Sequence, residues 1–180
     1  SYSRWLLGKK LFYDNALSST NTINCGSCHQ SAHAMADNVA FSLGVKNRVG
    51  VRNAPTLTNV AYNPYYNYDG GNKTLEMQVL VPIQEHVEFD FNIIEIAKRL
   101  STNTDYQNMS NKAYGRGLDY YVITRALANF ERTLISGNSK YDKYLKKEVA
   151  LTEAEQNGHD LFMSNTTNCN QCHSGFNFTN

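Results

Sequence analysis

The sequence predicts a mainly α-helical protein built from a duplicated domain with long loops, in which the second copy is incomplete. The pattern C-x-x-C-H occurs twice, at residues 25–29 and 169–173. The pattern G-x-x-L-F precedes each copy, at residues 8–12 and 158–162. Between the copies, residues 92–101 and 120–136 carry apolar residues at the helical period. Such self-similarity indicates a duplication, and the periodic segments indicate helices.

The first repeat joins GKKLF to the pentapeptide CGSCH, which is the attachment motif of c-type haem. Two thiols three residues apart can reach both vinyl groups of one porphyrin, and the adjacent imidazole then binds the iron. Cys25, Cys28 and His29 are therefore predicted to hold a haem, with Leu11 and Phe12 packed on it from the end of a short helix. A zinc site, a redox-active dithiol or two disulfides are alternatives, but zinc would not need a histidine after both cysteine pairs.

Two further residues after the first motif resemble axial ligands. His33 and Met35 are of the types that commonly bind haem iron in cytochromes. Because they follow His29 by only four and six positions, they should remain on its side of the ring or at the haem edge. We therefore expect His33 and Met35 to have packing or edge positions.

Residues 36–71 lack strong periodicity and contain the turn-rich stretches RNAP, YNPYYN and YDGGN. Long irregular loops in a compact domain are commonly functional. This loop is expected to wrap the haem edge and to form the pocket opposite His29.

Residues 92–101 and 120–136 are the two clearest predicted helices. In the second, Ile123, Leu127, Phe130 and Leu134 share one face. We expect these four side chains to belong to the core.

The second repeat begins with LTEAE, in which Thr152 is a predicted helix N-cap and Glu155 closes a capping box. The helix leads through GHDLF to CNQCH, so Cys169, Cys172 and His173 are predicted to hold a second haem. Seven residues, 174–180, follow this motif. A C-terminal continuation or a second chain is therefore expected to complete that haem pocket.

Composition excludes several classes of function. The chain has 180 residues, of which 41% are hydrophobic, enough for a substantial core. Its 17 basic and 16 acidic residues give a net charge of +1, which does not favour nucleic acid or an anionic membrane as partner. No apolar run approaches the roughly 18–20 residues of a membrane span. The N-terminus lacks the apolar core of a signal peptide, so the signal of an exported protein would have been removed.

The ordered series GKKLF, CGSCH, RNAPTLTNVAYN, PIQEHVEF, ALANFERTLIS, LTEAEQNGHDLF and CNQCHSG resembles the bacterial di-haem cytochrome c peroxidases. The resemblance includes the related enzymes that mature methylamine dehydrogenase. It implies an N-terminal peroxidatic haem c domain at residues 1–150 and the start of a C-terminal electron-transfer haem c domain at residues 151–180. It also implies the bacterial periplasm, hydrogen peroxide as substrate, and a small cytochrome or copper protein as electron donor.

The resemblance places Gln78 and Glu88 on the polar residues beside the peroxide. Cleavage of the O–O bond requires a proton to move from one oxygen to the other, and a sheltered carboxylate can carry it. The alternative for Glu88 is a solvated loop carboxylate. Asn53 falls on a ligand of a calcium ion between the haems.

Two positions depart from the family pattern. Val45 stands where the peroxidases have a histidine that caps the resting first iron, so the first haem is expected to be open. Tyr68 stands where the family has a tryptophan between the haems. Because tyrosine is also aromatic and oxidisable, we expect it to preserve electron transfer. His86 and His159 are expected to be surface residues.

Three functions remain open at this point. The first is reduction of hydrogen peroxide to water by donor electrons. The second is peroxide-dependent oxidation of a side chain in a partner protein. The third is electron transfer without catalysis in a larger assembly.

Overall fold

The computed structural model describes residues 1–179 and divides into two compact units. The larger comprises Ser1–Ala61 and Tyr65–Leu134, and the smaller comprises Tyr62–Pro64 and the residues from Ile135 onward. Within the described residues there is no β-sheet, only isolated bridges such as Leu43 with Val49. The predicted mainly α-helical class is therefore confirmed. The division into haem domains at residue 150 remains a prediction.

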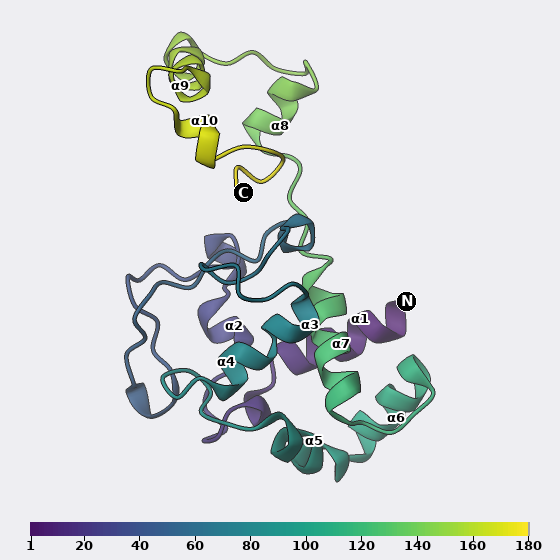
Figure 1. The fold of residues 1–180 in the computed structure, drawn as a ribbon. Helices are drawn as coiled ribbons and strands as arrows, with labels where there is room; N and C mark the ends of the chain where they lie inside the picture. The colour runs from purple at the N-terminus through teal and green to yellow at the C-terminus, as the bar shows by residue number, and fades with distance from the viewer. Residues whose placement is uncertain (180) are drawn as a thin grey trace. The chain divides into compact units, whose positions relative to one another are not determined.

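The larger unit contains seven α-helices among the described residues (Figure 1). They are α1 (Tyr2–Phe12), α2 (Cys25–Cys28), α3 (Leu75–Gln78), α4 (Leu80–Gln84), α5 (Ile93–Ser101), α6 (Thr104–Tyr114) and α7 (Tyr120–Glu131). Helix α1 packs along α7 and also contacts α6.

The core of this unit lies between α1 and α7. Leu7, Leu11 and Phe12 are fully buried, and the predicted core residues Ile123 and Leu127 are buried opposite them. Burying side chains of this size stabilises the fold by about 1.5–3 kcal/mol each.

Close packing of α1 against α7 explains why the first G-x-x-L-F pattern begins with glycine. A Cβ atom at Gly8 would lie 2.0 Å from the carbonyl oxygen of Ala126. A side chain at this position would force α1 away from α7. In the second copy, a Cβ at Gly158 would meet no described atom within 4 Å.

Helix α7 starts as expected but ends earlier than the apolar period indicates. Asp119 caps its start, because the Asp119 carboxylate accepts a hydrogen bond from the Val122 N–H at 2.9 Å. After Glu131 the chain turns, and the hydroxyl and the N–H of Thr133 both donate to the carbonyl of Phe130. Leu134 therefore lies beyond the helix, although it still packs against the core.

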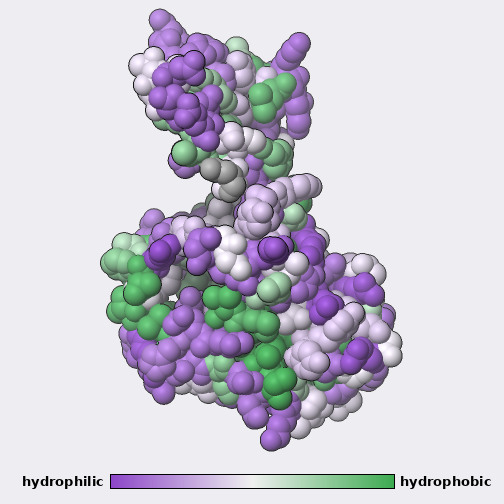
Figure 2. Space-filling model, in the orientation of Figure 1, coloured by the Kyte–Doolittle hydropathy of each residue, from purple (hydrophilic) through white to green (hydrophobic). Residues whose placement is uncertain are grey.

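The irregular segment 36–71 contains only short 3-10 turns, such as Val45–Asn47 and Val60–Tyr62. Several large apolar side chains on it are exposed, namely Val39, Phe41, Leu43, Val49 and Val51. Green apolar patches are visible on the surface of the larger unit in Figure 2.

The smaller unit contains α8 (Lys140–Leu145), α9 (Glu153–Met163) and α10 (Cys169–Cys172). The predicted capping box of α9 is confirmed: Thr152 Oγ1 accepts a hydrogen bond from the Glu155 N–H, and the Glu155 carboxylate accepts one from the Thr152 N–H. No helix in the described part of the chain is long and apolar enough to span a bilayer.

Candidate functional site

The first C-x-x-C-H motif forms a single helical turn with its histidine at the end. The His29 N–H donates to the carbonyl of Cys25 at 2.9 Å, which closes α2. The His29 Nδ1–H donates to the carbonyl of Met35, also at 2.9 Å. With the proton on Nδ1, Nε2 carries the lone pair that could bind a metal, and the backbone of Pro55 also interacts with the ring. Burial lowers the pKa of His29, which favours the neutral imidazole that binds iron.

The two cysteines of this motif are half-buried. Burial raises the pKa of both Cys25 and Cys28, so both are protonated at neutral pH. Within residues 1–179 the four cysteines are free thiols, and no three His, Cys, Asp or Glu side chains gather as a metal site.

The second motif repeats the geometry of the first. The His173 N–H donates to the carbonyl of Cys169 at 2.9 Å, and its Nδ1 bonds the carbonyl of Phe178 at 3.3 Å. The ring centroids of Phe162 and His173 lie 6.5 Å apart, with 42° between the ring planes. The ring centroids of Phe12 and His29 lie 6.4 Å apart, with 46° between the planes. Each G-x-x-L-F phenylalanine thus packs beside the histidine of its own motif.

A cavity of about 700 Å³ opens beside the second motif within the smaller unit. Leu151, Phe162, Met163 and Phe178 supply much of its apolar lining, and His173 points a polar group into it. A mostly apolar cavity with few polar groups is typical of a cofactor site. The residues present therefore fit a haem at this motif.

Glu88 lies near the first motif, in the turn that follows α4. Although the residue is exposed, desolvation by the surrounding protein raises the pKa of its carboxyl, and the negative charge of Glu85 adds to the shift. The charge of Glu88 in turn raises the pKa of the Cys25 and Cys28 thiols. The Glu88 carboxyl therefore favours its protonated form more than a solvated carboxylate would, and its charge acts on both thiols.

Gln78 is the last residue of α3, and the oxygen of its side-chain amide is buried. Its Oε1 atom is buried and has no hydrogen-bond partner in the described part of the chain. A buried polar atom without a partner is costly and commonly marks a place for a ligand or water. This atom supports the fit of a polar ligand in the larger unit.

Val45 and Tyr68 occupy the two positions that depart from the family pattern. Val45 is fully buried, and its N–H donates to the carbonyl of Glu88 at 2.9 Å. The Tyr68 hydroxyl lies 3.1 Å from the main-chain oxygen of Asn53 and 3.0 Å from its Oδ1. Both oxygens of Asn53 thus face a phenol, and a calcium site at Asn53 remains a prediction.

Met35, His33 and His86 have the expected environments, whereas His159 does not: its side chain is only 25% exposed and lines the cavity of the smaller unit. Met35 is buried in the core, whereas His33 is exposed. His86 is exposed and contacts Arg48 and Asp90. The ring of His159 lies beside two tyrosine rings of the smaller unit.

Two acidic residues near the first motif were missed in the sequence. The Oδ2 atom of Asp37 accepts a hydrogen bond from Ser42 at 2.5 Å, and its Oδ1 is buried without a partner among the described residues. Glu131 is buried, and burial raises its pKa to about 7. A charged residue within the apolar run ALANFE could have flagged Glu131, whereas nothing in the local pattern distinguishes Asp37.

Comparison with known proteins agrees with this geometry. Residues 3–150 match the family model described as di-haem cytochrome c peroxidase. The chain is 32% identical to the methylamine utilization protein MauG of Methylophilus methylotrophus, covering 96% of this chain and 52% of that protein. It is 37% identical to a cytochrome c551 peroxidase of Nitrosomonas europaea, covering 94% and 51%.

A solved structure is also similar. A MauG-like protein associated with microbial copper homeostasis superposes with a TM-score of 0.89 at 31% identity, covering 99% of this chain and 55% of that one. The chain spans about half the length of the curated relatives it matches. Sequence, motif geometry and fold agree, and the chain belongs to the di-haem cytochrome c peroxidase family.

Proposed function

We propose that this chain is the peroxide-reactive part of a periplasmic di-haem c peroxidase that reduces hydrogen peroxide to water with electrons from a small cytochrome or copper protein. The observation that carries the proposal is the position of Glu88: its backbone is joined to buried Val45 by a hydrogen bond of 2.9 Å, desolvation raises the pKa of its carboxyl, and its charge acts on the Cys25 and Cys28 thiols of the first haem motif. The buried, unpartnered Oε1 of Gln78 adds a second polar group of the expected type.

Two haems are the cofactors of the proposal. Cys25 and Cys28 would attach the first, with His29 Nε2 as its ligand, and Cys169, Cys172 and His173 would serve the second. When bound, the haems supply the iron at which peroxide is reduced and the path for electrons.

Glu88 would handle the proton that O–O cleavage requires. Its carboxylate accepts a proton from one peroxide oxygen and returns it to the other, which then leaves as water. With two electrons and two further protons, one peroxide gives two waters. A raised pKa suits this role, since it makes the carboxylate a stronger acceptor of the proton than an ordinary glutamate. Gln78 would orient the peroxide by hydrogen bonding.

Val45 supports an open site at the first haem. A valine side chain has no lone pair to donate to a metal, and its main-chain N–H is already bonded to Glu88. Tyr68 would take the place of the family tryptophan in electron transfer.

A second candidate is peroxide-dependent oxidation of a side chain in a partner protein. Val45 favours it, because an open site needs no activation step. Likeness to the methylamine utilization protein MauG also favours it.

The test compares Glu88→Gln with Glu95→Gln in the haem-loaded protein. Glu95 is an exposed carboxylate on α5 and serves as the matched control. Peroxide turnover with a reduced small cytochrome should fall about 10²- to 10⁴-fold in Glu88→Gln and stay unchanged in Glu95→Gln. Equal rates in the two variants would remove Glu88 from the proposed mechanism.

A further inference from the structure

Glu88 sits in the middle of a turn, residues 85–90, in which two N–H groups share one carbonyl. The N–H groups of Glu88 and Asp90 both donate to the carbonyl of Glu85, each at 3.0 Å. Asp90 has a φ of 49°, a left-handed conformation that is costly for a residue other than glycine. Contacts with the rest of the fold help to hold this turn in one conformation. Buried Phe89 is one anchor, because its N–H donates to the carbonyl of Pro82 at 3.2 Å and its carbonyl accepts from the Ser19 N–H at 3.0 Å.

Residues 44–45, in the irregular segment 36–71, supply further contacts to the turn. The Val45 N–H donates to the carbonyl of Glu88 at 2.9 Å. Gly44 lies so close that a Cβ there would come within 2.0 Å of the Val87 oxygen and 2.7 Å of the Glu88 Cα. The backbone at residues 44–45 is thus packed directly against the backbone that carries Glu88.

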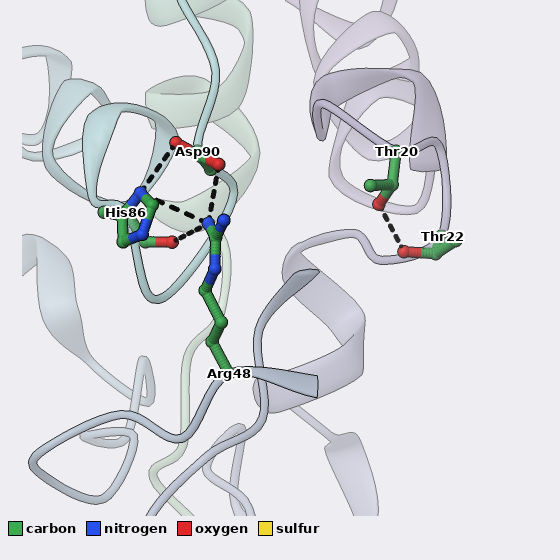
Figure 3. A network of polar contacts seen from close by, with 5 residues as sticks. All are labelled: Thr20, Thr22, Arg48, His86 and Asp90. Atoms are coloured by element: carbon green, nitrogen blue, oxygen red, sulfur yellow. Dashed lines mark hydrogen bonds and ion pairs between the residues drawn. The ribbon is translucent and has the colours of Figure 1, made fainter. Parts of the chain in front are cut away.

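Arg48 supplies the second set of contacts, and it reaches both ends of the turn (Figure 3). Its Nη1 donates to the carbonyl of His86 at 2.8 Å and to the carboxylate of Asp90 at 2.6 Å. His86 lies two residues before Glu88, and Asp90 lies two residues after it. Arg48 and Asp90 are each half-buried, with side chains 25% and 29% exposed, so water weakens the pair less than it would a fully exposed pair.

The hydrogen bonds made by Nη1 of Arg48 restrict the positions of its side chain and of both its partners. One nitrogen with two hydrogens can make two full hydrogen bonds, and the two shorter contacts use both. Arg48 Nη1 therefore has no hydrogen left for His86 Nδ1, which lies 3.2 Å away. His86 Nδ1 instead forms a hydrogen bond with Asp90 Oδ1 at 3.1 Å. Asp90 is therefore held by Arg48 on one oxygen and by His86 on the other (Figure 3).

We propose that Arg48 is a positioning residue for Glu88: by bonding His86 and Asp90 at the two ends of the turn, it fixes the carboxylate that the proposed function assigns to proton transfer. Arg48 itself takes no part in proton or electron transfer. The inference rests on the proposed function, because it gives Arg48 a role only through Glu88.

The test is a double-mutant cycle in the haem-loaded protein. A misplacement of about 1 Å can cost on the order of 10²-fold in rate, so Arg48→Ala should slow the reaction with peroxide about 10-fold or more. In a Glu88→Gln background, Arg48→Ala should cause no further loss, because its target is gone. Arg116→Ala, which removes the exposed ion pair with Asp119, is the matched control and should leave the rate unchanged.

A second measurement, independent of activity, reports the stability of the turn at residues 85–90. Amide hydrogen exchange in peptides covering residues 85–90 should speed up in Arg48→Ala and stay unchanged in Arg116→Ala. If Arg48→Ala does not load haem, Asp90→Asn removes only the negative charge of the pair and should give the same two effects at smaller size.

The outcomes separate the two proposals. A Glu88→Gln variant as fast as wild type defeats the proposed function. A slow Glu88→Gln beside an unaffected Arg48→Ala defeats only the positioning role. Equal losses from Arg48→Ala with and without Glu88 would show that Arg48 acts elsewhere, and would also overturn the inference.

Discussion

Arg132 binds both carboxylate oxygens of Glu76, with nitrogen to oxygen distances of 2.8 and 2.9 Å. This bidentate pair joins the end of α7 to α3, the helix that presents Gln78. The hydrogen bonds from Arg132 lower the pKa of Glu76. A pair of this geometry holds orientation as well as charge.

We predict that Glu76→Gln lowers the free energy of unfolding by about 1 kcal/mol, because it removes one partner of a half-exposed charged pair. Since the native pKa is lowered, the contribution of Glu76 is present above its ordinary value of 4.5 and is lost as the pH falls through the native pKa. Urea unfolding at pH 7 and pH 3 measures this. A difference from wild type that is as large at pH 3 as at pH 7 would contradict the ion pair.

The two repeat glycines should respond in opposite ways to alanine. Gly8→Ala places a Cβ against the Ala126 carbonyl and should destabilise the protein by about 3 kcal/mol or more. Gly158→Ala adds a methyl where the described structure is open, and should stabilise α9 by up to about 1 kcal/mol through helix propensity. Thermal unfolding of both variants gives the comparison. Similar effects at both positions would mean that Gly8 is not constrained by α7.

Glu131 should make the stability of the protein depend on pH. Burial raises its pKa to about 7 from an ordinary 4.5, although the charge of Arg132 opposes the shift. Below pH 4.5 the folded and unfolded chains both hold the proton. As the pH rises from 4.5 to about 7, only the unfolded chain releases it, so the free energy of unfolding falls and then levels off.

Glu131→Gln tests this linkage, because glutamine has a similar shape and does not titrate. The wild type should lose on the order of 3 kcal/mol more than the variant between pH 4.5 and pH 8. Urea unfolding across this range provides the measurement. Parallel curves for the two proteins would show that Glu131 is not the group responsible.

The sequence predicts the motif geometry well because that geometry is local. A four-residue spacing from Cys25 to His29 closes one helical turn, and Thr152 with Glu155 forms a capping box from neighbouring residues alone. Contacts between residues far apart in the sequence could not be predicted in this way. Arg48 meets Asp90 only because an irregular loop folds back on a distant turn, and no periodicity encodes that contact.

Val45 provides a prediction about the first haem. In the haem-loaded, fully oxidised protein, electron paramagnetic resonance should show a high-spin first haem, because valine offers no sixth ligand. Val45→His should convert that signal to low spin. A low-spin signal from wild type would indicate that another side chain, such as His33 or His86, occupies the position.

The most direct measurement is the intact mass of the haem-loaded protein under denaturing conditions. Both C-x-x-C-H turns present two thiols and one free imidazole nitrogen, so two haems per chain should remain covalently attached. Replacing Cys25 and Cys28 by serine should remove one haem, and replacing Cys169 and Cys172 should remove the other. A wild-type mass under these conditions that corresponds to one haem or to none would contradict a di-haem enzyme.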